Sequence, residues 1–351
     1  MAREQFSKIA YKTLQQGKSI AGLAHKEISS RIMNFIVPDN ELSNFNLDKN
    51  LLIKIQNSMD FLREEDWTDA EKNIYPFKLL FDEPWLRYLT QYPKLWLDMP
   101  NIWNRRRKEK YDDIPKSVDK DNYPKYYLRN FHHQTDGYLS DFSASIYDLQ
   151  VEILFNGSAD AMRRRIIKPL KEGLLNFADR KRNSLKIIDV ATGSGRTLKQ
   201  LRGAFPKEKI KGIDLSGSYL KEASRYLSDL DGDLIELIKG NAEELPFENN
   251  SVQGITCVYL FHELPRTIRE KVLKEFFRVL EPKGILVIAD SIQISDSPDF
   301  IDIMENFYKT FHEPFYCDYI KDDIDSKIQE VGFNKVKSNS FFMTKVWSAL
   351  K

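Results

Sequence analysis

The chain has 351 residues, 42% of them apolar, which allows a sizeable core and exceeds one small domain. Its 53 basic and 52 acidic residues leave a formal charge of +1, so the protein has no large net positive charge that would attract nucleic acid. Two cysteines, Cys257 and Cys317, exclude a disulfide framework and a cysteine-based zinc site. The N-terminus has no secretory signal, and no apolar run approaches the roughly 20 residues of a membrane span, so we expect a cytoplasmic protein.

Residues 1–140 are predicted to form a mainly α-helical N-terminal region. Charged and aromatic residues alternate irregularly there, and prolines recur from Pro76 to Pro124. Short helices that end at these prolines are expected, for example over Asp66–Asn73 and Trp85–Tyr92. We assign this region to a lid or to acceptor binding, and residues 141–351 to a second domain.

The pattern becomes regular after residue 140. Ser140 and Asp141 predict the capped start of a helix that runs through Phe155. Asn156 and Gly157 interrupt the pattern, and Ser158 can cap a second helix that extends to about Phe177.

Strands and helices then alternate. Strands are expected at Lys186–Val190, Ile210–Leu215, Asp233–Lys239, Gly254–Leu260 and Ile285–Ala289. Helices are expected near Arg196–Ala204, Tyr219–Leu230 and Arg266–Leu280, and a turn at Pro282–Gly284. Strands separated by helix-length segments predict a parallel sheet with helices on both faces. The final runs, Lys335–Phe342 and Thr344–Leu350, are too close for a helical crossover and predict an antiparallel hairpin.

The turn after the first predicted strand has the composition of a ligand-binding loop. Asp189 and Val190 end the strand, and Ala191–Gly195 lead into a helix. Glycines let backbone N–H groups approach a ligand, and a helix N-terminus favours a carboxylate. Leu198 stands where a dinucleotide loop has its third glycine, and no Gly-Lys-Ser/Thr of a phosphate loop occurs. The turn therefore predicts a site for an amino-acid carboxylate rather than a pyrophosphate.

Two further blocks follow the next two strands. Asp214 stands about twenty residues beyond the turn, where a carboxylate can accept both hydroxyls of a ribose. Asn241 and Ala242 follow the third strand, and an asparagine offers the donor and the acceptor that suit the edge of adenine. A local helix cap is the alternative role for Asn241.

These blocks, in this order and spacing, resemble the class I S-adenosylmethionine-dependent methyltransferases. Asp189–Gly195, Gly212–Ser216, Gly240–Phe247 and Arg278–Asp290 look most similar to the ubiquinone/menaquinone C-methyltransferase-like group, over roughly residues 145–351. The resemblance implies a Rossmann-like, seven-stranded, mostly parallel sheet that ends in an antiparallel β-hairpin. It also implies S-adenosyl-L-methionine as the cofactor, and methyl transfer to a small, hydrophobic or aromatic acceptor.

The same resemblance assigns the cofactor-binding positions. It implies that Asp189 faces the methionine amino group and that Gly193 and Gly195 form the turn. Tyr147 resembles a tyrosine that closes the cofactor pocket in this group, although core packing is its alternative role. Ala191 stands where many members have glycine. The expected cofactor-binding set is Asp189, Ala191, Gly193, Gly195, Asp214, Leu215, Asn241, Ala242, Tyr259 and Tyr147.

Three histidines are the candidate catalytic residues. His262 follows the fourth strand at the ligand-binding edge of the sheet, where it can act as a base or pack beside the cofactor. His132 and His133 belong to a polar and aromatic stretch, Asn130–Tyr138, which can line the acceptor pocket or form interior hydrogen bonds. A base is needed only if the acceptor loses a proton. Adjacent histidines point in different directions and no HExxH spacing occurs, so we expect no metal site.

The expected partner is a small-molecule acceptor, and no nucleic acid. The basic run Arg105, Arg106 and Arg107 predicts a solvated helix face, with contact to an anionic membrane as the alternative. The alternative function is a catalytically inactive S-adenosylmethionine-binding scaffold that serves a protein partner. A nicotinamide-dependent dehydrogenase is disfavoured by the turn and the hairpin. The oligomeric state and the methylated element stay open.

Overall fold

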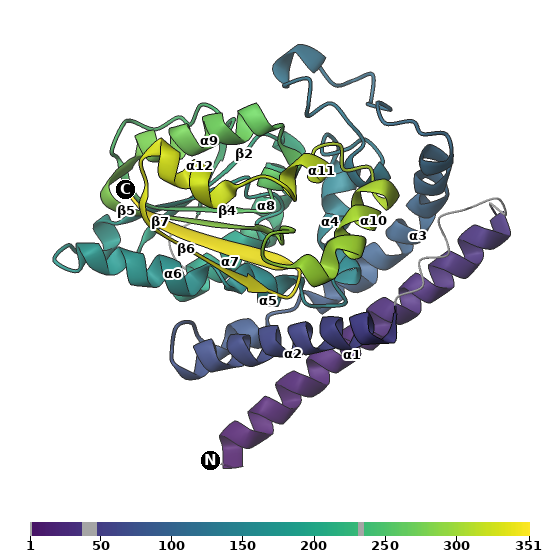
Figure 1. The fold of residues 1–351 in the computed structure, drawn as a ribbon, viewed down its shortest axis with the longest axis horizontal. Coiled ribbons are helices and arrows are strands. Elements are labelled where there is room, and N and C mark those ends of the chain that lie inside the picture. The colour runs from purple at the N-terminus through teal and green to yellow at the C-terminus, as the bar shows by residue number, and fades with distance from the viewer. Residues whose placement is uncertain (1, 37–47, 231–234) are drawn as a thin grey trace.

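A computed structural model describes residues 2–36, 48–230 and 235–351, and it shows a single mixed sheet surrounded by helices (Figure 1). The strands lie in the order β3-β2-β1-β4-β5-β7-β6. β1 to β5 run parallel, and β7 is antiparallel to both β5 and β6. The predicted Rossmann-like sheet with an antiparallel terminal hairpin is therefore confirmed. The strands are β1 (Lys186–Val190), β2 (Lys209–Asp214), β3 (Glu236–Lys239), β4 (Val252–Val258), β5 (Leu280–Ser291), β6 (Asn334–Phe341) and β7 (Thr344–Leu350).

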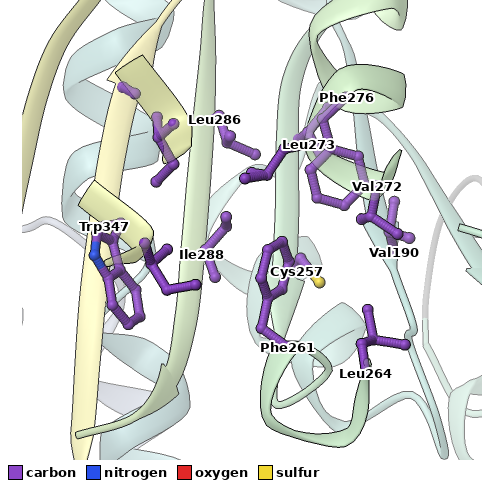
Figure 2. Packing of buried hydrophobic residues seen from close by; sticks show 14 of the residues in the cluster. Val190, Cys257, Phe261, Leu264, Val272, Leu273, Phe276, Leu286, Ile288 and Trp347 are labelled. Carbon is purple, nitrogen blue, oxygen red and sulfur yellow. The ribbon is translucent and has the colours of Figure 1, made fainter. Parts of the chain in front are cut away.

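Both faces of the sheet are covered, and alternate side chains of each strand divide between them. Ile188 of β1 joins a cluster with α9 (Arg266–Val279), α11 (Tyr316–Tyr319) and α12 (Ile324–Val331). Its neighbour Ile187 joins a cluster with α6 (Ile167–Gly173), α7 (Arg196–Ala204) and α8 (Gly217–Leu227). Figure 2 shows the first cluster, with Leu273 and Phe276 of α9 directed toward the strands.

The helices that precede the sheet follow the prediction in part. α4 spans Asp141–Leu154, and the Ser140 side chain accepts the N–H of Ser143 as the predicted cap. The predicted single helix to Phe177 is wrong. It divides into α5 (Ala159–Arg164), α6 and a 3₁₀ turn at Leu174–Phe177. Pro169 explains the break, because its ring cannot donate to the carbonyl of Arg165 and crowds that group.

The N-terminal helices are longer than predicted. α1 spans Ala2–Ile36, α2 spans Lys49–Glu71, and α3 spans Trp85–Arg107. The expectation that prolines end short helices is wrong for α3, which continues through Pro93 and Pro100. Burial of Tyr88 and Leu95 against Leu149 of α4 offsets the lost backbone hydrogen bonds. Two 3₁₀ turns, Lys120–Asn122 and Phe131–His133, are the helical pieces within the connection from α3 to α4.

A buried ionic cluster joins the N-terminal helices to the domain behind them. Asp66 of α2 is fully buried and accepts from Arg164 at 2.6 Å and 2.8 Å and from Arg165 at 2.9 Å. The hydroxyls of Tyr11 and Tyr75 donate to the same carboxylate. Trp67 and Leu79 share one hydrophobic cluster with β1 and α7. The division at residue 140 stays a prediction.

Two boundaries differ for physical reasons. The predicted turn at Pro282–Gly284 lies inside β5, where the pairing with β4 shifts register and Lys283 has a left-handed φ of 70°. Such a bulge bends the strand without ending it. The start of the predicted third strand lies partly outside the described residues.

α10 (Ile301–Thr310) follows β5. No helix among the described ranges is long and apolar enough to cross a membrane.

Candidate cofactor and acceptor site

Two adjoining cavities lie at the carboxyl ends of the parallel strands. The first, the cofactor pocket, is lined by the residues that end or follow β1, β2 and β4, among them Val190, Asp214 and Val258. The chain order reverses between β1 and β4, and ligands of open α/β sheets bind at such a switch point. Tyr147 and Tyr259 line both cavities, so the two spaces meet at these residues.

The turn after β1 presents its backbone to the cofactor pocket. Gly193 has a φ of 56°, and a Cβ added there would meet only Tyr219, at 3.9 Å. The space above Gly193 is therefore open to a ligand. Ala191 also has a left-handed φ of 58°, which explains why glycine suits this position and shows that alanine can adopt it.

Asp214 anchors the same turn from the end of β2. Its two oxygens accept the N–H groups of Gly193 and Ser216, both at 2.8 Å. Burial raises the pKa of Asp214 to about 6, although these N–H donors lower it. Each carboxylate oxygen has a second lone pair, so Asp214 retains two acceptor sites for a diol.

The far end of the cofactor pocket is lined by Leu215, Asn241 and Ala242. The Asn241 side chain accepts the N–H of Glu243 at 3.0 Å, a local turn rather than the helix cap expected as its alternative role, because no helix begins at this position. Its amide nitrogen lies 3.4 Å from Glu243 Oε1. Leu215 and Ala242 offer apolar surface for a planar ring.

Two of the predicted cofactor residues lie behind the pocket wall. Asp189 is buried, and its oxygens accept from the hydroxyls of Thr192 at 2.7 Å and Thr256 at 2.6 Å. Burial raises its pKa to about 6. Gly195 starts α7 with a φ of 86°, and a Cβ there would lie 3.1 Å from Ala223. Asp189 and Gly195 therefore support the conformation of the turn without lining the pocket.

Four tyrosines close the cofactor pocket: Tyr126, Tyr127 and Tyr138 from the connection before α4, and Tyr219 from α8. Tyr138 belongs to the stretch Asn130–Tyr138 that was expected to line the acceptor pocket, whereas the other three were not predicted. The Tyr126 hydroxyl donates to Glu243 at 2.8 Å, and the Tyr138 hydroxyl donates to Glu263. The tyrosine-rich composition of residues 123–138 is the signal that could have identified them.

The second space, the acceptor cavity, has a volume of about 410 Å³ and is lined mainly by apolar and aromatic side chains. That volume lies in the range of pockets for small molecules. Its aromatic lining is Tyr147, Phe155, Tyr259, Phe307, Phe311, Tyr316 and Phe342.

His262 lines the acceptor cavity from the segment after β4. Its Nδ1 lies 2.6 Å from Asp290 Oδ1, at the end of β5. Burial lowers the pKa of His262, but Asp290 and Glu263 outweigh this effect and raise it to about 9. A carboxylate on Nδ1 directs the proton-accepting lone pair of the neutral ring to Nε2.

The neighbouring histidines occupy different surroundings. His132 lines the acceptor cavity, with Nδ1 2.9 Å from Glu313 and Nε2 3.7 Å from Glu263. Burial lowers its pKa, but both glutamates raise it, to about 10. Three ligand atoms of His132, Glu263 and Glu313 lie within 4.8 Å of one another, as a metal would require. The absence of a metal site stays a prediction.

His133 and the basic run lie away from both cavities. His133 is buried, and its Nε2 accepts the N–H of His312 at 3.4 Å. Burial, followed by the nearby positive groups, lowers its pKa to about 4. The expected solvated face is wrong for Arg105, which is buried and donates to the His133 carbonyl at 2.9 Å. Arg106 is half-buried and Arg107 is exposed. Contact of this run with an anionic membrane stays a prediction.

The cofactor pocket fits S-adenosylmethionine by its donor and acceptor set. Gly193 leaves the open space that a Cβ would enter, and Asp214 offers acceptors for a ribose. Arg163 lines the pocket and offers guanidinium donors for a carboxylate, although it also pairs with Asp160 at 2.9 Å.

Comparison with known proteins agrees with this arrangement. A family model described as a methyltransferase domain matches residues 187–284. A demethylmenaquinone methyltransferase of Thermotoga maritima is 32% identical over 177 residues, which are 50% of this chain and 70% of that protein. A carboxy-S-adenosyl-L-methionine synthase of Trichodesmium erythraeum is 34% identical over 129 residues, which are 36% of this chain and 49% of that protein. Human N-acetylserotonin methyltransferase in complex with SAM superposes with a TM-score of 0.49 at 11% identity, over 72% of this chain and 66% of that one.

The Thermotoga relative combines more than 30% identity with coverage of over two thirds of its length. The family model covers β1 to the start of β5. The chain therefore belongs to the class I S-adenosylmethionine-dependent methyltransferases, and S-adenosyl-L-methionine is its cofactor.

Proposed function

We propose that this chain methylates a hydroxyl group of a small, hydrophobic or aromatic acceptor that binds in the acceptor cavity. One observation carries the proposal. Tyr147 and Tyr259 line both cavities, so the cofactor pocket adjoins an apolar, aromatic space that His262 also lines. Such a space excludes water and aligns an apolar acceptor with the donor, as methyl transfer requires.

Residues of the first cavity hold the cofactor. Asp214 accepts from the ribose, the Gly193 backbone and the N-terminus of α7 face the methionine part, and Arg163 pairs with its carboxylate. Leu215 and Ala242 pack on the adenine. When bound, S-adenosylmethionine supplies a methyl group that its sulfonium activates for displacement.

His262 acts as the base in this proposal. The neutral ring accepts the acceptor's hydroxyl proton on Nε2 as the new carbon–oxygen bond forms; the methyl carbon–sulfur bond would break in the same displacement, with S-adenosylhomocysteine as the leaving group. Asp290 holds Nδ1 and stabilises the imidazolium that results, which later releases its proton to water. His132, held between Glu313 and Glu263, positions the acceptor from a place next to His262, since Glu263 Oε1 lies 3.7 Å from His132 Nε2 and 3.8 Å from His262 Nε2. His133 has no part in the reaction.

Transfer of a radiolabelled methyl group from S-adenosylmethionine to a panel of hydrophobic phenols tests this function. We expect product with the unaltered chain and loss of at least about a hundredfold in kcat with His262→Ala, since general-base catalysis contributes that much. His312→Ala is the matched control, because His312 lines neither cavity, and it retains activity. Cofactor binding without transfer to any phenol supports the scaffold instead.

A further inference from the structure

Lys26 lies on α1, on the wall of the acceptor cavity formed by α1, α2 and the end of α4. Its ammonium group donates to the carbonyl of Leu154 and to Asn156 Oδ1, both at 2.8 Å. An ammonium has three N–H donors, so one remains beyond these two neutral acceptors.

The charge of Lys26 has no acidic partner among the residues that the structure describes. Glu152, the acid nearest to it along α4, lies 3.6 Å from Lys18 and 3.9 Å from Arg163 instead. Lys18, two turns earlier on α1, also pairs with Glu83 at 2.5 Å. Burial lowers the pKa of Lys26 to about 8, which agrees with a cation that lacks a counter-charge.

A half-buried, unpaired cation beside an apolar cavity is costly unless a ligand neutralises it. Asn156 also lines the cavity, and its side-chain oxygen accepts from Lys26, which leaves the amide nitrogen as a further donor. One charge and one neutral donor match a carboxylate, whereas a phosphate dianion calls for more positive charge.

We infer that Lys26, with Asn156, binds a carboxylate at the end of the acceptor that is remote from the methylated hydroxyl. The inference rests on the proposed function, because the acceptor is placed with its hydroxyl at His262. Leu154 follows Tyr147 by seven residues on α4, and a rise of 1.5 Å per residue separates them by about 10 Å. The acceptor in this inference is therefore an aromatic acid whose carboxylate lies at the Lys26 end of the cavity, about 10 Å along α4 from Tyr147.

A series of ω-(4-hydroxyphenyl)alkanoates of increasing chain length, each paired with its neutral amide, tests this assignment. Binding is measured by calorimetry with saturating S-adenosylhomocysteine. At one chain length we expect the acid to bind at least about tenfold more tightly than the amide, because a charge-assisted hydrogen bond gives such a ratio. Lys26→Met removes this preference and leaves S-adenosylhomocysteine affinity unchanged. Lys26→Arg retains the preference, which guards against misfolding of the first variant.

Lys12→Met is the matched control, because Lys12 is an exposed lysine of the same helix, 3.4 Å from Glu64. It should leave the acid preference intact. Equal binding of acid and amide, a preference that survives in Lys26→Met, or no binding of any probe overturns the inference. Methyl transfer to the probes reports separately on the proposed function. An acid preference without transfer refutes only that function, and equal transfer to acids and amides refutes only the role of Lys26.

Discussion

Replacement of Asp214 by alanine should abolish tight cofactor binding. The carboxylate retains two acceptor sites after Gly193 and Ser216 have donated to it, one for each ribose hydroxyl. A hydrogen bond to a charged group contributes about 1.5–3 kcal/mol, so two contribute about 3–6 kcal/mol. At about 1.4 kcal/mol per factor of ten, the Kd for S-adenosylhomocysteine should rise about 10²–10⁴-fold in Asp214→Ala.

Asp214→Asn separates the charge from the shape of the turn. Its amide oxygen preserves one acceptor, so we expect a smaller rise, about 10–100-fold. Calorimetric titration with S-adenosylhomocysteine measures both variants, and thermal melting confirms that they fold. Asp229→Ala, an exposed aspartate after α8, is the control and should bind as the unaltered chain does. A Kd for Asp214→Ala within about threefold of the unaltered value, well below one lost hydrogen bond, would refute the assignment.

Three further outcomes follow from the structure. His262 must be neutral to accept a proton, and its pKa is raised to about 9, so kcat/KM for a hydroxyl acceptor should rise with pH up to that value. Asp290→Asn should move this rise to lower pH. A profile that is flat from about pH 6 to about pH 10 contradicts the base role. Asp66→Ala leaves buried Arg164 without its partner and should lower the free energy of unfolding by about 3–5 kcal/mol in urea titrations. A loss below about 1 kcal/mol contradicts the structural role of the buried ionic cluster around Asp66. Gly193→Val adds a β-branched side chain at a left-handed φ and fills the open space above Gly193, so S-adenosylhomocysteine affinity should fall at least about tenfold. Gly217→Val is the control and should bind normally, because a Cβ at Gly217 meets no atom within 4 Å. Equal affinities of the two variants contradict the role of this space in cofactor binding.

The sheet was predictable because its signals are local. β1 and α7 match the expected ranges residue for residue, since an apolar run and a glycine turn define both. The N-terminal helices were not predictable in the same way. Proline is a local signal against a helix, whereas the packing of Tyr88 and Leu95 that keeps α3 continuous depends on residues far along the chain.

The site residues were likewise predictable where their signals are local. Asp214 and Gly193 could be identified from spacing alone, because the first βα turn and the end of β2 meet in every sheet of this topology. The tyrosines over the pocket, and Lys26 in the acceptor cavity, come from segments that only tertiary folding brings there. The two predicted histidines His132 and His133 are neighbours in sequence, yet left-handed backbone at both sends one ring into the cavity and leaves the other outside it.

A crystal structure with S-adenosylhomocysteine bound tests the central claim most directly. We expect the ribose on Asp214 and the sulfur at Tyr147 and Tyr259, facing the acceptor cavity and His262. A sulfur atom enclosed by side chains, with no open path to that cavity, would contradict methyl transfer and favour a binding scaffold.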